Sequence, residues 1–243
     1  MNPRDEREYR GPHDHPELFR APAVLLFASI PKLRPPDQLL TPDEQHDNAR
    51  FVASAAPAAL RECVAQLCRF VFAHDDLTLV FGAHPAISPM VLAAAQAAPV
   101  RERRKRVVIF QSEHFRGRLP DDTLRLANWE SGTLLWTPEV QVAGPPIRTK
   151  RVSLTRMREL MVTVPNLAFA IAAGGMEGVI EEALLWEAHH PDLPLFAIPS
   201  TGSAAEQLYR EDPARRSQGI DRDLATSRAY PKLLRALFHA AGM

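Results

Sequence analysis

The chain has 243 residues, with 29 Lys and Arg residues against 29 Asp and Glu residues. Its length suffices for a full hydrophobic core without disulfides or metals, and its even charge argues against nucleic acid or an anionic membrane as a partner. The two cysteines exclude a disulfide scaffold, and without a secretory signal or a membrane-length apolar run the sequence favours a cytoplasmic protein.

Residues 1–20 are charged and lack an apolar period, which predicts a flexible or surface-draped arm ahead of a single domain over residues 21–243. In that domain, apolar runs typical of buried strands alternate with amphipathic patterns typical of helices. The expected strands are 23–28, 77–81, 106–110, 133–136, 167–173 and 195–198. The expected helices are 57–73, an alanine-rich one opened by Pro85 and Pro89, 154–161, one ending near 189, and two beginning near 204 and 227. Residues 31–42 are expected to form a loop, and residues 112–132 a polar excursion.

This alternation predicts an α/β fold: a Rossmann-like, doubly wound, mainly parallel sheet with helices on both faces. Ligands of such sheets bind at the carboxyl ends of the strands, where helix N-termini offer unpaired N–H groups. Small or polar residues follow the predicted strands there and make up the expected ligand-binding set. They are Ser29, Ile30 and Pro31; Gly82, Ala83 and His84; Gln111 and Ser112; Gly174, Gly175, Met176, Glu177 and Gly178; and Ser200, Thr201, Gly202 and Ser203.

The paired glycines are the most informative junction, because two consecutive glycines cost backbone entropy that a plain connection would avoid. Backbone N–H groups at residues 174–178 and 201–203, helped by the nearby hydroxyl groups, predict a phosphate or pyrophosphate site at two helix ends. Glu177 or Glu181 is expected to accept hydrogen bonds from ribose hydroxyls. The helix dipole alone would also favour acidic residues in a first turn, so this alternative stays open.

Other signals leave two interpretations each. His84 is an acid, a base or a phosphate donor, or else a turn histidine bonded to backbone, which the sequence favours. Gln111 and Ser112 either contact a base or phosphate or simply end a strand. The basic run at residues 101–106 is expected to be a solvated approach to a strand rather than a nucleic-acid patch. No His or Cys spacing matches a metal motif, and no cofactor is expected.

The segment Leu167–Ala173, Gly174-Gly175-Met-Glu-Gly178-Val-Ile-Glu181-Glu182 resembles the core of the SLOG superfamily. The Lonely Guy phosphoribohydrolases of that superfamily carry Pro-Gly-Gly-x-Gly-Thr-x-x-Glu after an upstream Arg-Lys pair. Here Ala173, Glu177 and Gly178 replace the Pro, the next Gly and the Thr. The family's Glu falls on Glu181 without a gap or on Glu182 with one inserted residue, and its Arg on Arg156 or Arg158. The other junctions are more similar to the defence-associated nucleotide-sensor branch.

The resemblance implies one of two functions. The first is a sensor or binding module for a nucleotide-derived small molecule, such as an ADP-ribose-like or cyclic nucleotide, acting through an effector protein or a homo-oligomer. The second is a hydrolase that cleaves the N-glycosidic bond of a nucleotide, with Glu181 or Glu182 as the acid and Arg156 or Arg158 neutralising phosphate. The altered Gly-Thr and the missing Pro favour the sensor.

Overall fold

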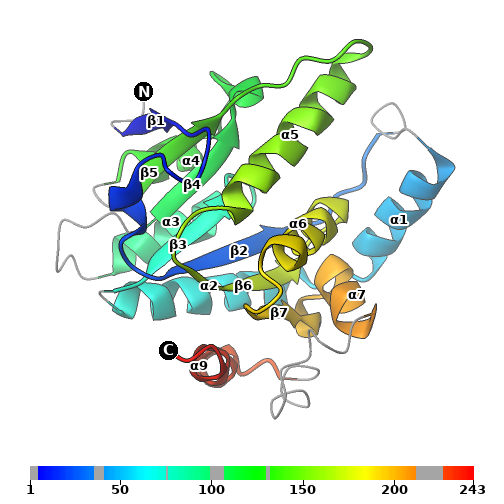
Figure 1. The fold of residues 1–243 in the computed structure, drawn as a ribbon. Helices are drawn as coiled ribbons and strands as arrows, with labels where there is room; N and C mark the ends of the chain where they lie inside the picture. Colours follow the sequence, from blue (N-terminus) through cyan, green and yellow to red (C-terminus); the bar gives the residue numbers. More distant parts are fainter. Residues whose placement is uncertain (1–4, 36–40, 75, 99–106, 130–131, 212–226) are drawn as a thin grey trace. The chain divides into compact units, whose positions relative to one another are not determined.

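The computed structural model describes residues 5–35, 41–74, 76–98, 107–129, 132–211 and 227–243 (Figure 1). Seven strands form one sheet in the order β1-β5-β4-β3-β2-β6-β7, and every described pairing register is parallel. The strands are β1 (Glu6–Glu8), β2 (Ala23–Ser29), β3 (Thr78–Gly82), β4 (Val107–Ser112), β5 (Gly132–Thr137), β6 (Leu167–Gly174) and β7 (Leu195–Ile198). The predicted α/β, Rossmann-like sheet is confirmed, with its six expected strands.

The helices follow the strands in the expected alternation. They are α1 (Pro42–Ala53), α2 (Pro57–Ala73), α3 (Ser88–Ala97), α4 (Asp121–Ala127), α5 (Pro146–Val162), α6 (Glu177–His189), α7 (Ser203–Glu211) and α9 (Tyr230–Ala240), with 3-10 turns η1 (Pro16–Phe19), η3 (Glu113–Phe115) and η4 (Pro199–Thr201). Helices α1 and α4 were not expected. The first begins at the last residue of the predicted loop, and the second lies inside the predicted polar excursion. The basic run at residues 101–106 lies outside the described residues.

The N-terminal stretch was expected to form a flexible or surface-draped arm over residues 1–20, and part of it is a strand of the sheet. From Glu6 it pairs in parallel with β5 as strand β1, and the N–H of Tyr9 continues the pairing by donating to the Trp136 carbonyl at 2.8 Å. Tyr9, Leu18 and Phe19 are buried. The strand is ordered because burial of a few apolar side chains is enough to hold a short edge strand against the sheet, even among many charged residues.

The chain's contacts gather in two compact units, which are described separately. Unit 1 comprises residues 1–26 and 68–168, and unit 2 comprises residues 27–67 and 169–243. In unit 1, α5 packs on β3, β4 and β5, and α3 packs on α4 (Figure 1). In unit 2, α6 and α7 pack on β7, and α1 packs on α7.

Two kinds of feature are absent from the described residues. No helix there is both long enough and apolar enough to span a membrane. In the same residues, no three His, Cys, Asp or Glu side chains are grouped so that they could hold a metal ion.

Candidate functional site

The strand order places a topological switch point beside β2. The chain moves outward from β2 through β3, β4 and β5, and then returns to the other side of β2 with β6 and β7. Ligands of open α/β sheets bind outside the carboxyl ends of the strands at such a point. Here those ends are Ser29 on β2 and Gly174 on β6, and both belong to unit 2. The predicted junctions after β2 and β6 therefore meet at this edge.

The paired glycines form the tight turn between β6 and α6. Gly174 has φ +60° and Gly175 has φ +92°, a region that side chains other than glycine rarely enter. A Cβ atom on Gly175 would lie 2.3 Å from Val179 Cγ2. The Gly174 N–H donates to Thr201 Oγ1 at 2.7 Å, and the Gly175 N–H donates to the Ser29 carbonyl at 2.8 Å. The prediction that these two amides hold an anion is wrong, because both are already paired within the fold.

The hydroxyl groups of the junction after β7 likewise form hydrogen bonds within the protein. Thr201 Oγ1, besides accepting from Gly174, donates to the Ile198 carbonyl at 2.6 Å. Ser203 Oγ donates to the Phe51 carbonyl at 2.7 Å. These hydroxyls tie η4 and α7 to β6 and α1, so they position elements of unit 2 and are not the free ligand donors expected from the sequence.

The remaining residues of that junction follow the same pattern. Ser200 Oγ shares a hydrogen bond of 3.1 Å with the Tyr230 hydroxyl. Gly202 has φ +74°, and a Cβ atom there would lie 2.1 Å from the Ser54 carbonyl oxygen. Close packing against the chain between α1 and α2 therefore explains this glycine without a ligand.

The first turn of α6 keeps its capacity to bind. The opening N–H groups of an α-helix have no acceptor within the helix, and Met176 supplies no side-chain cap at the start of α6. Together with the positive end of the helix dipole, the amides of Met176, Glu177 and Gly178 favour an anionic group at this position. This part of the predicted set keeps its proposed role.

An ion pair that the sequence did not predict lies beside this turn. The Arg34 guanidinium contacts Glu177 Oε2 at 3.0 Å, and the two side chains are 32% and 33% exposed. Glu177 Oε1, in contrast, is buried and has no hydrogen-bond partner among the described residues. An unfilled buried acceptor costs about 1–3 kcal/mol, so this oxygen is suited to accept a hydrogen bond from a ligand.

Asn48 holds the loop that carries Arg34. It lies on α1 and is only 1% exposed. Its Oδ1 accepts the Arg34 N–H at 2.9 Å, and its Nδ2 donates to the Lys32 carbonyl at 3.0 Å and to Met176 Sδ at 3.3 Å. One buried amide thus fixes both the Arg34 loop and the residue before α6. Arg34 and Asn48 have no local sequence signal, because one lies in a proline-rich loop and the other in a polar segment.

The residues proposed for a glycosidase divide between the units. On α6 in unit 2, Glu181 lies one turn beyond Glu177 on the same helix face, and Glu182 is buried. On α5 in unit 1, Arg156 pairs with Glu159 at 3.0 Å on an exposed face. Arg158, further along α5, is half-buried.

Unit 1 contains the other predicted junctions. The Gly82-Ala83 pair ends β3, and the Ala83 N–H bonds to the Phe110 carbonyl at 3.0 Å. His84 accepts the Ala86 N–H on its Nδ1 at 3.2 Å, which is the turn role that the sequence favoured. Ile30 and Pro31, in unit 2, follow β2 toward the Arg34 loop; Pro31 is buried and Ile30 is half-buried.

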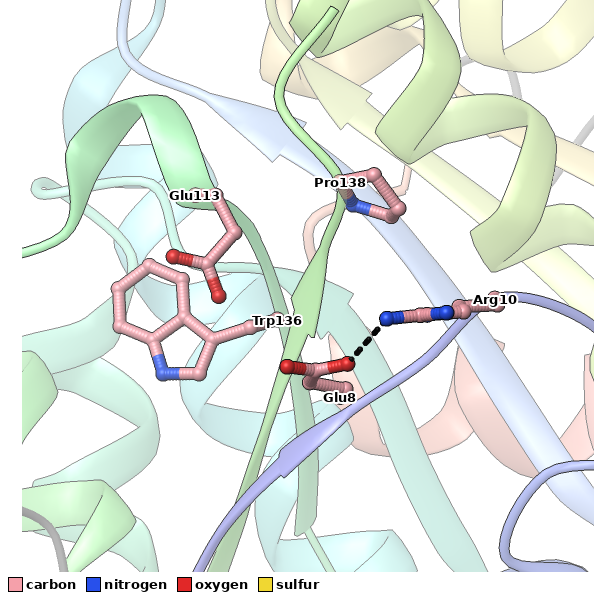
Figure 2. A pocket seen from close by; sticks show the side chains of 5 residues that line it. All are labelled: Glu8, Arg10, Glu113, Trp136 and Pro138. Atoms are coloured by element: carbon pink, nitrogen blue, oxygen red, sulfur yellow. Dashed lines mark hydrogen bonds and ion pairs between the residues drawn. The ribbon is translucent and has the colours of Figure 1, made fainter.

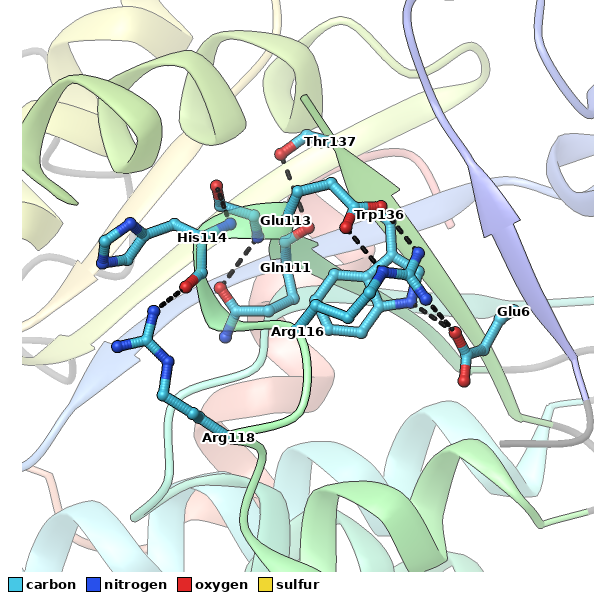
Figure 3. Close-up of polar contacts among 9 residues, drawn as sticks. Glu6, Gln111, Glu113, His114, Arg116, Arg118, Trp136 and Thr137 are labelled. Carbon is cyan, nitrogen blue, oxygen red and sulfur yellow. Dashed lines mark hydrogen bonds and ion pairs between the residues drawn. The ribbon is translucent and has the colours of Figure 1, made fainter. Parts of the chain in front are cut away.

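Gln111 and Ser112 end strand β4. Gln111 Oε1 accepts the Ser112 N–H at 2.9 Å, and Ser112 Oγ accepts the His114 N–H at 3.3 Å to open η3. These bonds match the strand-ending interpretation of the two residues (Figure 3). The Gln111 side chain is mostly buried at this edge.

A cavity of about 220 Å³ lies near the same edge, lined by Glu8, Arg10, Glu113, Trp136 and Pro138 (Figure 2). Its charged groups are already paired. Glu8 contacts Arg10 at 2.8 Å, and Glu113 contacts the Arg116 Nε at 2.6 Å. In the described part of the chain, none of the residues that line this cavity has a buried polar side-chain atom without a hydrogen-bond partner, whereas Glu177 has one.

Comparison with known families agrees with this architecture. The SLOG cluster3 family model matches residues 50–238, which is most of the chain. The chain belongs to the SLOG cluster3 family. No curated protein matches the sequence significantly. The SLOG resemblance seen at the paired glycines is therefore confirmed, and the SLOG cluster3 match includes the whole turn from β6 into α6. Arg34 and Asn48 precede the matched residues.

Proposed function

We propose that this SLOG cluster3 protein binds a nucleotide-derived small molecule at the carboxyl ends of β2 and β6, as a sensor or binding module. The observation that carries the proposal is the Glu177 carboxylate, which has one oxygen on Arg34 and the other buried without a partner among the described residues. SLOG membership supports a nucleotide-related ligand, and the switch point is where such sheets bind one.

The groups at this edge suit the two polar parts of a nucleotide. A phosphate is favoured by the Arg34 guanidinium and by the amides that open α6, since both present N–H donors to negative charge. A ribose hydroxyl can donate to Glu177 Oε1 and satisfy it. Phosphate and carboxylate repel each other, so the phosphate belongs on the Arg34 side and the sugar on the Glu177 Oε1 side.

A glycosidase is the second candidate, supported by the position of Glu181. Glu181 follows Glu177 by four residues on α6, so the two residues share one face of the helix, which supports a role for Glu181 beside the ribose. The ungapped alignment with the Lonely Guy motif supports Glu181 as the catalytic acid, whereas an alignment with one inserted residue supports Glu182. A carboxylate there would stabilise an oxocarbenium-like ribose or activate water.

One experiment separates the two candidates. The protein is incubated with AMP, ATP, NAD and ADP-ribose, and its melting temperature and the release of free base are both measured. The sensor proposal expects at least one nucleotide to raise the melting temperature through binding to the native state, with no base released. Release of base that is abolished by Glu181→Ala would instead establish the glycosidase. If no nucleotide raises the melting temperature and no base is released, both candidates are refuted.

A sensor in the cytoplasm must transmit its bound state. We propose that it does so through an effector protein or a homo-oligomer, in a signalling role of the kind found in antiviral defence. Light scattering with and without the nucleotide that binds tests the oligomer. A molar mass that stays at 27.1 kDa in both conditions would exclude the homo-oligomer, so that only the effector protein would remain as the route of signalling.

A further inference from the structure

A group of basic side chains surrounds Phe115 in unit 1, apart from the site proposed above. The His114 ring meets the Phe115 ring edge-on, with 5.0 Å between centroids. The Arg118 guanidinium carbon lies 5.7 Å from the Phe115 centroid, and Lys150 Nζ lies 5.9 Å from it. The three residues come from η3, from the loop after it and from α5, so the fold gathers them from separate elements.

His114 is oriented by a carboxylate. Its Nδ1 lies 2.7 Å from Glu139 Oε1, and the His114 side chain is 13% exposed. An ionised carboxylate only accepts hydrogen bonds, so Nδ1 carries the hydrogen. Within the described part of the chain, the other ring nitrogen, Nε2, has no hydrogen-bond partner. A carboxylate that fixes one ring nitrogen and leaves the other available is the arrangement of an imidazole that binds or exchanges a proton.

Further bonds hold both partners in place. The His114 N–H donates to Ser112 Oγ, and Arg118 donates to the His114 carbonyl, which brings its guanidinium beside the histidine (Figure 3). Next to Glu139, the Val140 N–H donates to Ser153 Oγ of α5 at 3.0 Å. The imidazole therefore has a defined orientation before any ligand arrives.

The charges around Phe115 leave a net positive site. Glu139 accepts the His114 Nδ1 hydrogen and keeps its negative charge, which the two cations Arg118 and Lys150 exceed by one. Both oxygens of Glu113, the nearest other carboxylate along the chain, bind Arg116, at 2.6 Å each. The Lys150 ammonium has no ion pair among the described residues. Two permanent cations and one imidazole thus face a half-buried aromatic ring without an opposing free carboxylate.

We propose that His114, Arg118 and Lys150 form a second anion site, which binds the terminal phosphate of a small-molecule phosphate monoester. Arg118 and Lys150 supply the charge that a dianionic phosphate requires. A phosphate monoester loses its second proton near pH 6, and His114 Nε2 offers one hydrogen bond to its phosphate oxygens. A phosphodiester has no such second ionisation and one charge fewer, so the site selects a monoester over a nucleic-acid backbone.

The test is a titration followed by NMR of the histidine side chains. Inorganic phosphate is the first probe and dimethyl phosphate the second, at equal ionic strength, and the His114 signals are assigned with His114→Gln. Phosphate is expected to shift the His114 signals saturably, and dimethyl phosphate to leave them in place. Lys150→Gln and Arg118→Gln should each weaken phosphate binding about tenfold, while Arg125→Gln, on α4 of the same unit, should not.

Three results would overturn the proposal. They are a His114 signal that does not respond to phosphate, an equal response to dimethyl phosphate, and an equal loss of binding in Arg125→Gln and Lys150→Gln. The first two use the unaltered protein, so they hold even if a variant fails to fold. Every residue of the phosphate site belongs to unit 1. A negative result in this titration therefore does not affect the nucleotide site proposed at Glu177, and a negative result in the nucleotide experiments does not affect the phosphate site.

Discussion

The glycines at positions 174 and 175 show how one sequence feature can have two explanations. Their pairing indicated a phosphate-binding turn, because glycine lets backbone approach a ligand. The structure explains them by left-handed backbone and close packing, and their amides bond to Ser29 and Thr201. Sequence alone could predict that glycine was needed here but not which of the two reasons applied.

Substitution of Gly175 therefore affects the fold first. Gly175→Ala must adopt φ +92° and place a Cβ atom 2.3 Å from Val179 Cγ2, so we expect a loss of about 2 kcal/mol or more in unfolding free energy. Urea unfolding measures it. Gly11→Ala is the control, because a Cβ atom at Gly11 meets nothing within 4 Å; equal stability of the two variants would contradict the packing explanation.

Thr201 offers a matched pair of variants. Thr201→Val keeps the shape but leaves the buried Gly174 N–H without its acceptor, which should cost about 1–3 kcal/mol. Thr201→Ser keeps the hydroxyl and should recover most of that loss. Chemical denaturation of both variants provides the measurement, and a valine variant as stable as the serine variant would show that the bond contributes little.

The buried thiol of Cys63 leads us to expect a loss of stability at alkaline pH. Burial raises the pKa of its thiol from 9.0 to about 12. The folded state therefore holds the proton more tightly than the unfolded state, so this contribution is complete below pH 9 and is lost as the pH rises toward 12. The unfolding free energy of the wild type should fall with pH above 9 by up to about 1.4 kcal/mol per unit from this group. In Cys63→Ala the slope should be smaller, and identical slopes would contradict the assignment.

At the scale of elements, the six apolar strands and the helices that follow them could be predicted because their patterns are strong. Helix α1 was missed because of its twelve residues only Asn48 and Phe51 are buried, which leaves almost no apolar period to detect. Strand β1 was missed because it has three charged or polar residues and gains its stability from pairing with β5. The unexpected parts of the candidate site, Arg34 and Asn48, lie in or beside such weak segments.

Tyr9 tests how β1 is anchored. Its ring is fully buried and meets Phe110 edge-on at 5.0 Å, whereas its hydroxyl has no hydrogen-bond partner among the described residues. Burial also raises the pKa of that hydroxyl. Tyr9→Phe should leave stability unchanged or slightly raised, and Tyr9→Ala should cost about 3–5 kcal/mol. Thermal unfolding compares them, and a large loss in Tyr9→Phe would reveal a partner for the hydroxyl.

At the scale of the whole molecule, the parallel sheet followed from the alternation of strands and helices, but the strand order did not. That order decides where the switch point lies, and the switch point beside β2 brings the ends of β2 and β6 together. Pairings between residues more than a hundred positions apart, such as Arg34 with Glu177, leave no local signal in a single sequence. The ligand site at this edge stays a prediction, and the contact between Arg34 and Glu177 was found only in the structure.

The central claim is that Arg34 and Glu177 together bind a nucleotide, and calorimetry with ADP-ribose and AMP tests it most directly. The wild type is compared with Arg34→Gln, Glu177→Gln, the double variant and Arg210→Gln, a control on α7. We expect each single variant to weaken binding about tenfold, the double variant to lose less than the sum because the two side chains contact each other, and the control to match the wild type. Equal affinity in all five proteins would contradict the account.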